Sequence, residues 1–203
     1  RLERYDNQPY GLAWEILNTN LYPENHPYSW STIGFLKDIE SYTLDDVKDF
    51  FRNYYSPNNA CLVVAGDFEN EDANILLERY FGSIEPFNSN HKPAVIKPVL
   101  KSNIFVEHKD NVQLDRIYLA WHSDFIFGKN DSSLEVAADI LTGSKNSRLY
   151  KKLVFDLQIA QDVTAFQYSG KFGGQFMIIS TARPGTNLDE LKKIILEEVN
   201  TIA

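Results

Sequence analysis

Residues 159–182, IAQDVTAFQYSGKFGGQFMIISTA, decide the fold predicted for this sequence. Two stretches, Ile159–Tyr168 and Gln175–Ala182, are rich in the β-branched and aromatic residues that pack well on a pleated sheet. They flank the glycine-rich segment Ser169–Gly174, and glycine accepts the backbone angles of a tight turn. The stretch therefore predicts two strands joined by a turn.

Further elements lie on both sides of this strand pair. Apolar spacing predicts two more strands upstream, two helices between the strand groups, and a closing helix that turns its apolar residues inward. In chain order these are strands at 104–108 and 116–122, helices at 133–141 and 147–153, and a helix that opens at Asn187 and carries Leu188, Leu191, Ile195 and Ile202. Strands, helices, strands and a helix predict an α+β fold, with helices packed on one face of a largely antiparallel sheet.

The upstream part repeats the end of this pattern. Apolar spacing predicts a helix over 10–21, and Thr43 followed by an acid at Asp46 predicts the start of another. Ala60–Ala65 is a continuous apolar run that suits a strand covered on both faces. An acidic helix start and an apolar face then predict a helix that ends near Gly82.

We interpret these patterns as two related repeats. Residues 1–85 would be the C-terminal part of a truncated first repeat, and residues 101–203 a largely complete second repeat that ends near 203 or continues beyond it. Residues 86–100 lose the periodicity around three prolines and would be a linker. Because the sequence starts without a methionine and in a helix-like stretch, we expect it to be cut from a longer chain.

Composition excludes several classes of protein. Apolar residues make up 43% of the 203 residues and charged residues 24%, as in an ordinary globular protein. The formal net charge of −8 argues against binding the phosphate backbone of nucleic acid. No apolar run approaches the length of a membrane span. The single cysteine, Cys61, lies in the apolar run 60–65 and is predicted to be a buried, inert thiol. One cysteine suits either the cytoplasm or the cell envelope.

The histidines do not form a metal-binding motif in sequence. His26, His91, His108 and His122 are separated by 65, 17 and 14 residues, so neither H-x-x-E-H nor any i, i+4 pair occurs. His122 ends a predicted strand, where it could line a cleft or simply be hydrogen bonded. Nucleophile elbows and phosphate-binding loops are missing too. We therefore predict no catalytic, cofactor-binding or metal-binding residue in this chain.

A string of short motifs nevertheless resembles the pitrilysin–insulinase family of bacterial zinc peptidases, in the family's order and over essentially the whole chain. The motifs are Asp6–Gly11, His26–Tyr28, Thr32–Gly34, Tyr54–Ala60, Leu62–Phe68, Tyr80–Gly82, Ser147–Tyr150, Gln158–Gln161 and Ala182–Gly185. Each motif alone has an ordinary structural meaning, such as turn chemistry at Pro57–Asn59. Their order and spacing carry the resemblance.

The resemblance implies that the zinc ligands lie outside this chain. In the family, two histidines of H-x-x-E-H and a distal glutamate hold zinc, and the motif glutamate acts as general base on the metal-bound water. By register the distal glutamate falls immediately before Arg1, and the motif lies further upstream. Glu3 is a nearby carboxylate that is out of register. Zinc is thus implied for the parent protein and not for this chain.

A second family feature is also missing. An arginine and a tyrosine seven residues apart bind substrate in the family and stabilise the reacting carbonyl. The positions that match them here are Val154 and Gln161, while Arg148 belongs to the preceding S-R-L element. In two-chain members one subunit carries zinc and the other carries this pair.

The resemblance leads to three hypotheses. In the first, the chain is a non-catalytic fragment of a zinc metalloendopeptidase subunit that hydrolyses enclosed peptides. The partner of that subunit would be a second family subunit that supplies the Arg/Tyr pair, or another copy of the same protein in a homo-oligomer. In the second, the parent is a non-catalytic structural or peptide-holding subunit of the same family. In the third, the chain is an unrelated binding module that shares only the fold.

Overall fold

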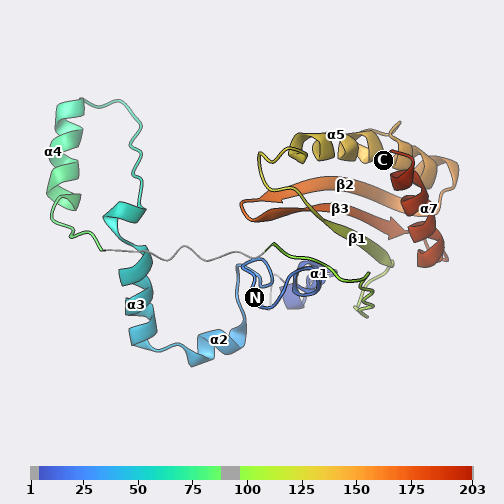
Figure 1. Ribbon diagram of the computed structural model, residues 1–203, viewed down its shortest axis with the longest axis horizontal. Coiled ribbons are helices and arrows are strands. Elements are labelled where there is room, and N and C mark those ends of the chain that lie inside the picture. Colours follow the sequence, from blue (N-terminus) through green and yellow to red (C-terminus); the bar gives the residue numbers. More distant parts are fainter. Residues whose placement is uncertain (1–4, 88–96, 203) are drawn as a thin grey trace. The chain divides into compact units, whose positions relative to one another are not determined.

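A computed structural model describes residues 5–87 and 97–202 (Figure 1). Its contacts divide the chain into two compact units. The first unit joins residues up to Ile33 with those from Val95 onward, and the second unit runs from Gly34 to Ala94. Each unit is considered by itself below.

The first unit is built on a three-stranded antiparallel sheet in the order β1-β3-β2. Its strands are β1 (Arg116–Ser123), β2 (Ala160–Gly170) and β3 (Gly173–Ala182). The predicted strand pair of residues 159–182 is confirmed as β2 and β3, with Gly170 paired to Gly173 across the turn. Gly173 has φ of +141°, a backbone angle that favours glycine.

Helices of the second predicted repeat cover one face of this sheet, as the sequence predicts. They are α5 (Asp131–Thr142), α6 (Arg148–Tyr150) with the π-helical continuation Lys151–Asp156, and α7 (Leu188–Asn200). Leu149, Leu153 and Ile195 are fully buried between these helices and the sheet. The Asn187 side chain accepts a hydrogen bond from the Asp189 N–H at 2.7 Å and caps α7.

The opposite face of the sheet is covered by α1 (Ala13–Leu21), which comes from the region assigned to the first repeat (Figure 1). The Trp14 ring packs 6.1 Å from Phe166 and 6.4 Å from Tyr168 on β2. The Tyr10 hydroxyl donates to the Leu114 carbonyl at 2.6 Å, just before β1. Residues 5–33 are therefore part of the first unit, and the α+β class predicted from sequence is confirmed.

The second unit consists of short helices, and its residues 34–87 include no buried apolar side chain. Its elements are α2 (Leu36–Ser41), α3 (Leu44–Tyr54), the 3-10 turn η2 (Pro57–Asn59) and α4 (Asn70–Phe81). Thr43 and Asp46 form the predicted capping box at the start of α3. None of α2, α3 and α4 holds a buried residue. Two side chains link distant parts of this unit: the Ser56 hydroxyl accepts a hydrogen bond from the Phe87 N–H at 2.8 Å, and the Asn58 amide donates to the Phe87 carbonyl at 3.1 Å.

Three local predictions are wrong for the described residues. The segments 60–65 and 104–108 form no strand, and Cys61 is exposed. Val63, which was predicted to be covered on both faces, is 81% exposed. The reason is that an apolar run becomes a strand only when a neighbouring strand supplies hydrogen-bond partners, and none of the described residues does so here.

The predicted repeat boundaries at 85 and 101 describe which parts of the chain are related in sequence. The two units describe which parts of the chain contact one another. The contacts group residues up to 33 with those from 95 onward. The boundaries therefore stay a prediction. Most of the predicted linker, residues 88–96, lies outside the described residues. Among the described helices, none is long and apolar enough to cross a membrane.

Candidate functional site

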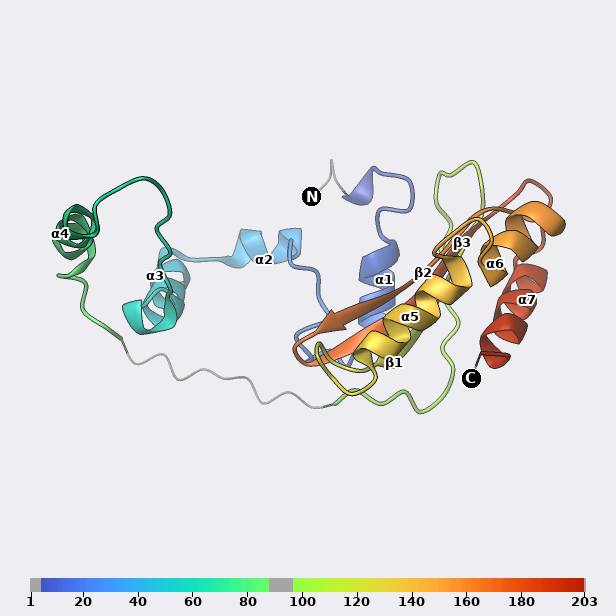
Figure 2. The same ribbon diagram turned by 90° about the horizontal axis from the view of Figure 1, so that it is seen from above.

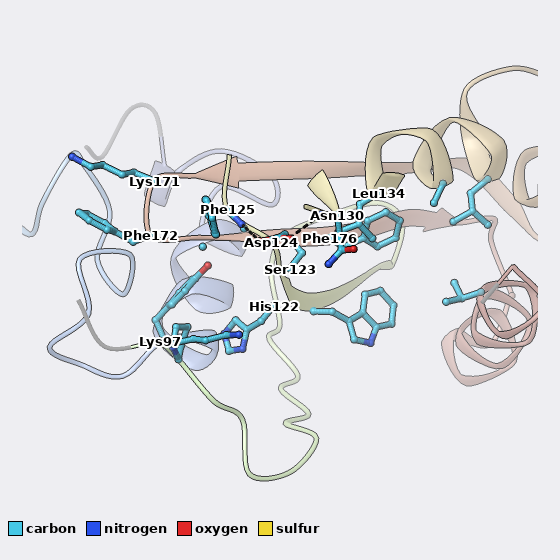
Figure 3. Close-up of a pocket in the computed structure, with 18 of the residues that line it drawn as sticks. Lys97, His122, Ser123, Asp124, Phe125, Asn130, Leu134, Lys171, Phe172 and Phe176 are labelled. Atoms are coloured by element: carbon cyan, nitrogen blue, oxygen red, sulfur yellow. Dashed lines mark hydrogen bonds between the residues drawn. The ribbon is translucent and has the colours of Figure 1, made fainter. Parts of the chain in front are cut away.

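A cavity of about 950 Å³ lies along β1 in the first unit (Figure 3). It is bounded by the end of β1, the β2–β3 turn, α5, α7 and the segment that begins at Lys97. These elements all belong to one unit, so its walls are defined by that unit alone. In the ribbon view from above, α5 crosses the strands of the sheet and α7 lies beside one end of it (Figure 2).

The larger part of the cavity wall is apolar. Trp121 and Phe176, with ring centres 6.3 Å apart, form the sheet side. The helix side is formed by Leu134 and Leu141 of α5, by Val199 of α7, and by Ile202 just after α7. Trp121, Leu134, Val199 and Ile202 also pack against the hydrophobic core. The cavity is therefore the open end of that core.

The mouth of the cavity carries positive charge. Lys97, Lys171 and His122 line it together with Asp124. Both carboxylate oxygens of Asp124 accept backbone hydrogen bonds, from Phe125 at 3.0 Å and from Asn130 at 2.9 Å. In the described part of the chain, no carboxylate lies within ion-pair distance of either lysine. The Lys171 ammonium lies 5.7 Å from the centre of the Phe172 ring and points away from the other lining residues (Figure 3).

The loop beside the mouth is rigidly held. Asp131 accepts hydrogen bonds from the Ser169 hydroxyl and from the Phe127 N–H at 2.9 Å. These hydrogen bonds, from Ser169 first and then from Phe127, lower the pKa of the Asp131 carboxyl. The Ile126 N–H donates to the Gly170 carbonyl at 3.0 Å and ties the loop to the β2–β3 turn. The rim is thus fixed before any ligand arrives.

Two of the three histidines of this unit, His26 and His122, have structural roles. His26 is 3% exposed, stacks on Tyr22 at 4.6 Å and accepts the Tyr28 N–H at Nδ1 at 3.0 Å. Burial first, and then the nearby His122, lower the pKa of His26. The Nε2 atom of His122 lies 2.8 Å from the Leu21 carbonyl oxygen. His122 both borders the cavity and is hydrogen bonded. The two roles that its sequence position suggested, lining a cleft and forming a hydrogen bond, therefore occur together.

These histidines do not fit a zinc site. One nitrogen of His26 and one of His122 are already hydrogen bonded, His108 is exposed, and His91 lies outside the described residues. Among residues 5–87 and 97–202, no three His, Cys, Asp or Glu side chains come together as metal ligands would. The prediction that this chain holds no metal, cofactor or catalytic group stays a prediction.

The structure also places the residues that match the family's Arg/Tyr pair. Val154 is 8% exposed and belongs to the core beneath the sheet, and Gln161 is exposed at the irregular start of β2. Arg148 donates to Glu198 at 3.1 Å and serves the packing of α6 on α7. Glu3 lies outside the described residues.

Sequence reasoning missed the cavity. Lys97, Trp121 and Lys171 come from three distant segments, and no motif joins them. Trp121 in a strand signals packing, but only the sheet order shows that its strand lies at an edge. A pair of lysines flanking an edge strand could be noticed only after that order was known.

The first unit is an α+β domain whose described residues assemble no metal centre. Residues 41–203 match the family model described as the peptidase M16 inactive domain. The chain therefore belongs to this family, and the resemblance to pitrilysin–insulinase peptidases is confirmed.

Relatives and solved structures agree with this assignment. The chain is 29% identical to the zinc protease PqqE of Helicobacter pylori over 199 residues, which cover 95% of this chain and 44% of that protein. It is 23% identical to the uncharacterized zinc protease YmxG of Bacillus subtilis, covering 99% of this chain and 48% of that protein. The crystal structure of a Helicobacter pylori protease matches with a TM-score of 0.82 and 28% identity, covering 98% of this chain and 49% of that one. The chain thus spans about half the length of the relatives it matches.

Proposed function

We propose that this chain is the non-catalytic part of a zinc-dependent metalloendopeptidase subunit that hydrolyses peptides. One observation carries the proposal: residues 41–203 match an M16 inactive domain, while the whole chain covers just under half of relatives named zinc proteases. The catalytic residues of such a protein would then lie in the other half. Zinc would activate water there, and the residues described here would contribute none of its ligands.

In this proposal the chain contributes a surface that handles peptides. The open core beside β1 and the two lysines at its mouth provide an apolar and cationic surface. Peptides are the substrates, and the partner is a second family subunit that carries the Arg/Tyr pair, or another copy of the parent. The burial of Val154 supports the need for that pair from elsewhere, because a side chain at this position faces the core.

The test compares the 203-residue chain with the full-length protein that contains it. Both are assayed for zinc by elemental analysis and for cleavage of a quenched fluorescent peptide. We expect no stoichiometric zinc and no cleavage for the chain alone, and chelator-sensitive cleavage for the full-length protein. Stoichiometric, chelator-removable zinc in the chain alone, needed for cleavage, would contradict the proposal.

A second candidate is a structural or peptide-holding subunit without activity. The Val154 and Gln161 positions favour it, since neither side chain can act as the family's arginine or tyrosine. The sequence of about a hundred residues upstream of Arg1 would distinguish the two candidates. An intact H-x-x-E-H motif there, with a glutamate beside Arg1, supports the enzyme, and degenerate positions support the holding subunit. The third hypothesis, an unrelated module, is wrong because the family match covers most of the chain.

A further inference from the structure

The loop that follows α1 is held against the sheet by buried aromatic side chains. This loop, residues 22–29, contains the His26–Tyr28 motif, to which the proposed function gives no role. Tyr22 and His26 are both buried, and their rings stack with centres 4.6 Å apart. The Tyr28 ring meets the His26 ring edge-on at 5.2 Å. Because residues of the first unit bury His26, its burial does not depend on what else a longer protein contains.

Two hydrogen bonds fasten this loop to the β2–β3 hairpin. The Gln175 side-chain amide donates to the Tyr22 hydroxyl at 3.1 Å, and the Phe172 N–H donates to the Tyr28 hydroxyl at 3.2 Å. At Gly170, a Cβ atom would collide with the Tyr28 hydroxyl, so the loop approaches the turn more closely than a side chain would permit. We call residues 22–29, held in this way, the clamp.

The clamp requires a neutral His26. Its Nδ1 atom accepts the Tyr28 N–H at 3.0 Å, so the hydrogen of the neutral ring is on Nε2. Protonation adds a hydrogen to Nδ1, which can then no longer accept a hydrogen bond. The Nε2 atom is buried, and no group of the described residues forms a hydrogen bond with it. The charged ring would therefore lose one hydrogen bond and gain none in a buried site, which is unfavourable.

No negative charge faces a protonated His26 from the groups that surround it. The titratable side chains around it are the two tyrosines of the clamp and His122 of β1, whose ring lies 5.3 Å from Tyr22. Burial, the largest cause, raises the pKa of the Tyr22 hydroxyl, so this group stays uncharged in neutral and acid solution. Within the part of the chain that the structure describes, neither histidine forms an ion pair with a carboxylate.

The charged side chains of the neighbouring segments do not supply a counter-charge. Lys97 lines the same cavity as His122 (Figure 3), and Lys171 lies in the β2–β3 turn, so both are cations. Asp124 follows β1, and both of its carboxylate oxygens already accept backbone N–H groups. Glu24 of the clamp is exposed, so its charge is screened by solvent. The surroundings thus favour the neutral form of His26.

We propose that the clamp is an acid-sensitive switch, in which protonation of His26 releases residues 22–29 from the β2–β3 turn. The residues that follow the clamp lead to Gly34, where the second unit begins. Release would therefore free the segment of chain that connects the two units. The proposal goes beyond the peptidase function proposed above and does not depend on it, because all of its groups lie in the first unit.

Acid should open the clamp and neutral pH should keep it closed. Burial first, and then His122, lower the pKa of His26 below the value of about 6.5 that a free histidine has. The open clamp therefore binds a proton more readily than the closed clamp does. The closed clamp has its full stability above about pH 6.5, and its opening constant rises as the pH falls below that value, by at most about tenfold per pH unit for one proton.

Hydrogen exchange of the 203-residue chain, followed from about pH 7.5 to about pH 5, tests the switch. After correction for the intrinsic effect of pH on exchange, the amides of residues 22–29 should lose protection as the pH falls below about 6.5. The amides of α5, which is packed on the other face of the sheet, should keep theirs. A loss of protection that occurs at the same pH in α5 would mean acid unfolding of the whole unit and would overturn the proposal.

Two asparagine variants identify the histidine responsible. His26→Asn keeps a side-chain oxygen that can accept the Tyr28 N–H but removes the titrating group, so protection of the clamp should no longer depend on pH. His108→Asn makes the same change at an exposed histidine and should behave like wild type. An equal pH dependence in His26→Asn and wild type would overturn the proposal.

His122→Gln tests the alternative sensor. It keeps a donor for the Leu21 carbonyl and removes the second imidazole, so most of the pH dependence should remain. Complete loss of the pH dependence in this variant would assign the switch to His122 and contradict the role of His26.

A measurement on the wild-type chain keeps the proposal testable if His26→Asn does not fold. In an NMR titration, the His26 ring signal, assigned through its contacts with Tyr22, should shift only below the pH at which a free histidine titrates. Titration of His26 at about pH 6.5 or above, with the clamp still protected, would show that the closed clamp accepts the proton and would overturn the proposal.

Discussion

The two units of this chain have similar apolar composition in their helices but opposite burial. In the first unit, Leu149, Leu153 and Ile195 are fully buried against the sheet. In the second unit, the apolar face of α3 is solvent exposed, with Phe50 and Phe51 each at 52%. The sheet makes the difference, because a helix gains stability by burying one face against another element. An amphipathic helix without such an element signals a missing partner surface.

The largest expected effect comes from the core of the first unit. Leu149→Ala should lower the free energy of unfolding by about 2–5 kcal/mol, because it opens a cavity where nothing is exposed. The matched variant Leu76→Ala on α4, where the side chain is half exposed, should cost less than about 1 kcal/mol. Urea unfolding is followed by far-UV circular dichroism, which reports the helices of both units, and by tryptophan fluorescence, which reports the first unit because all three tryptophans lie there.

Equal shifts of the urea midpoint for these two leucines would contradict the contrast between the units. In that case Leu76 would have to be buried in solution by a surface that the described residues do not supply.

The exposed face of α3 should promote association. Replacing Phe50 and Phe51 together by aspartate removes two large apolar groups from the surface, each worth about 1.5 kcal/mol or more when buried. We expect the dissociation constant of any self-association to rise by at least about tenfold, measured by sedimentation velocity over a concentration series. Asn53→Asp on the same helix is the control for charge alone. A wild-type chain that stays monomeric at high concentration, with an ordered second unit, would refute this prediction.

A smaller effect is expected at the start of α3. Thr43→Ala removes the side chain that accepts the Asp46 N–H at 3.2 Å, and losses of such caps cost about 1 kcal/mol. Because α3 has no tertiary packing to compensate, its amides should exchange about fivefold faster. Hydrogen exchange resolved over residues 44–54 measures this. Thr43→Ser keeps the hydroxyl and should behave like wild type, and an unchanged exchange rate in the alanine variant would show that packing, not the cap, orders α3.

The smallest effect concerns the ion pairs between α6 and α7. Glu198 accepts from Lys152 at 2.8 Å and from Arg148 at 3.1 Å, and the partners are more than a third exposed. The Lys152 hydrogen bond first, and the Arg148 hydrogen bond after it, hold the pKa of Glu198 below its usual value despite burial. Because solvent screens these partly exposed ion pairs, Glu198→Gln should lower the free energy of unfolding by less than about 1 kcal/mol at neutral pH.

The sign of the pH dependence follows from the lowered pKa. A carboxyl whose pKa is depressed in the folded state stabilises the fold above its unfolded pKa, and this contribution is lost as pH falls through the folded value. The difference in urea midpoint between wild type and Glu198→Gln should therefore be full at pH 7 and shrink below about pH 4. A difference that persists unchanged at lower pH would mean that the pair acts through packing rather than charge.

Local patterns in the sequence predicted much of the first unit. The strands at 116–122 and 159–182, the helices at 133–141 and 147–153 and the capping at Asn187 agree with the structure, because period and capping are local properties. The strand predictions at 60–65 and 104–108 were wrong because strand formation is not a local property. Their residues favour strands, but pairing depends on neighbours that a local pattern does not contain.

The candidate site could not be predicted in the same way. Lys97, Trp121 and Lys171 are brought together by the order of the sheet, and the sequence contains no motif that joins them. The wrong assignment of Cys61 as buried has the same origin, since its apolar neighbours indicate burial only where a covering element is present.

By itself, the sequence determined the α+β class, the positions of most helices, the family and the spacing of histidines that lacks a metal-binding motif. These properties depend on which residues follow one another. Only the tertiary structure decided that α1 lies on the second face of the sheet, that the core opens at β1, and that residues 34–87 bury no apolar side chain. Those outcomes depend on which surfaces meet, and burial is a property of two surfaces rather than of one stretch of chain.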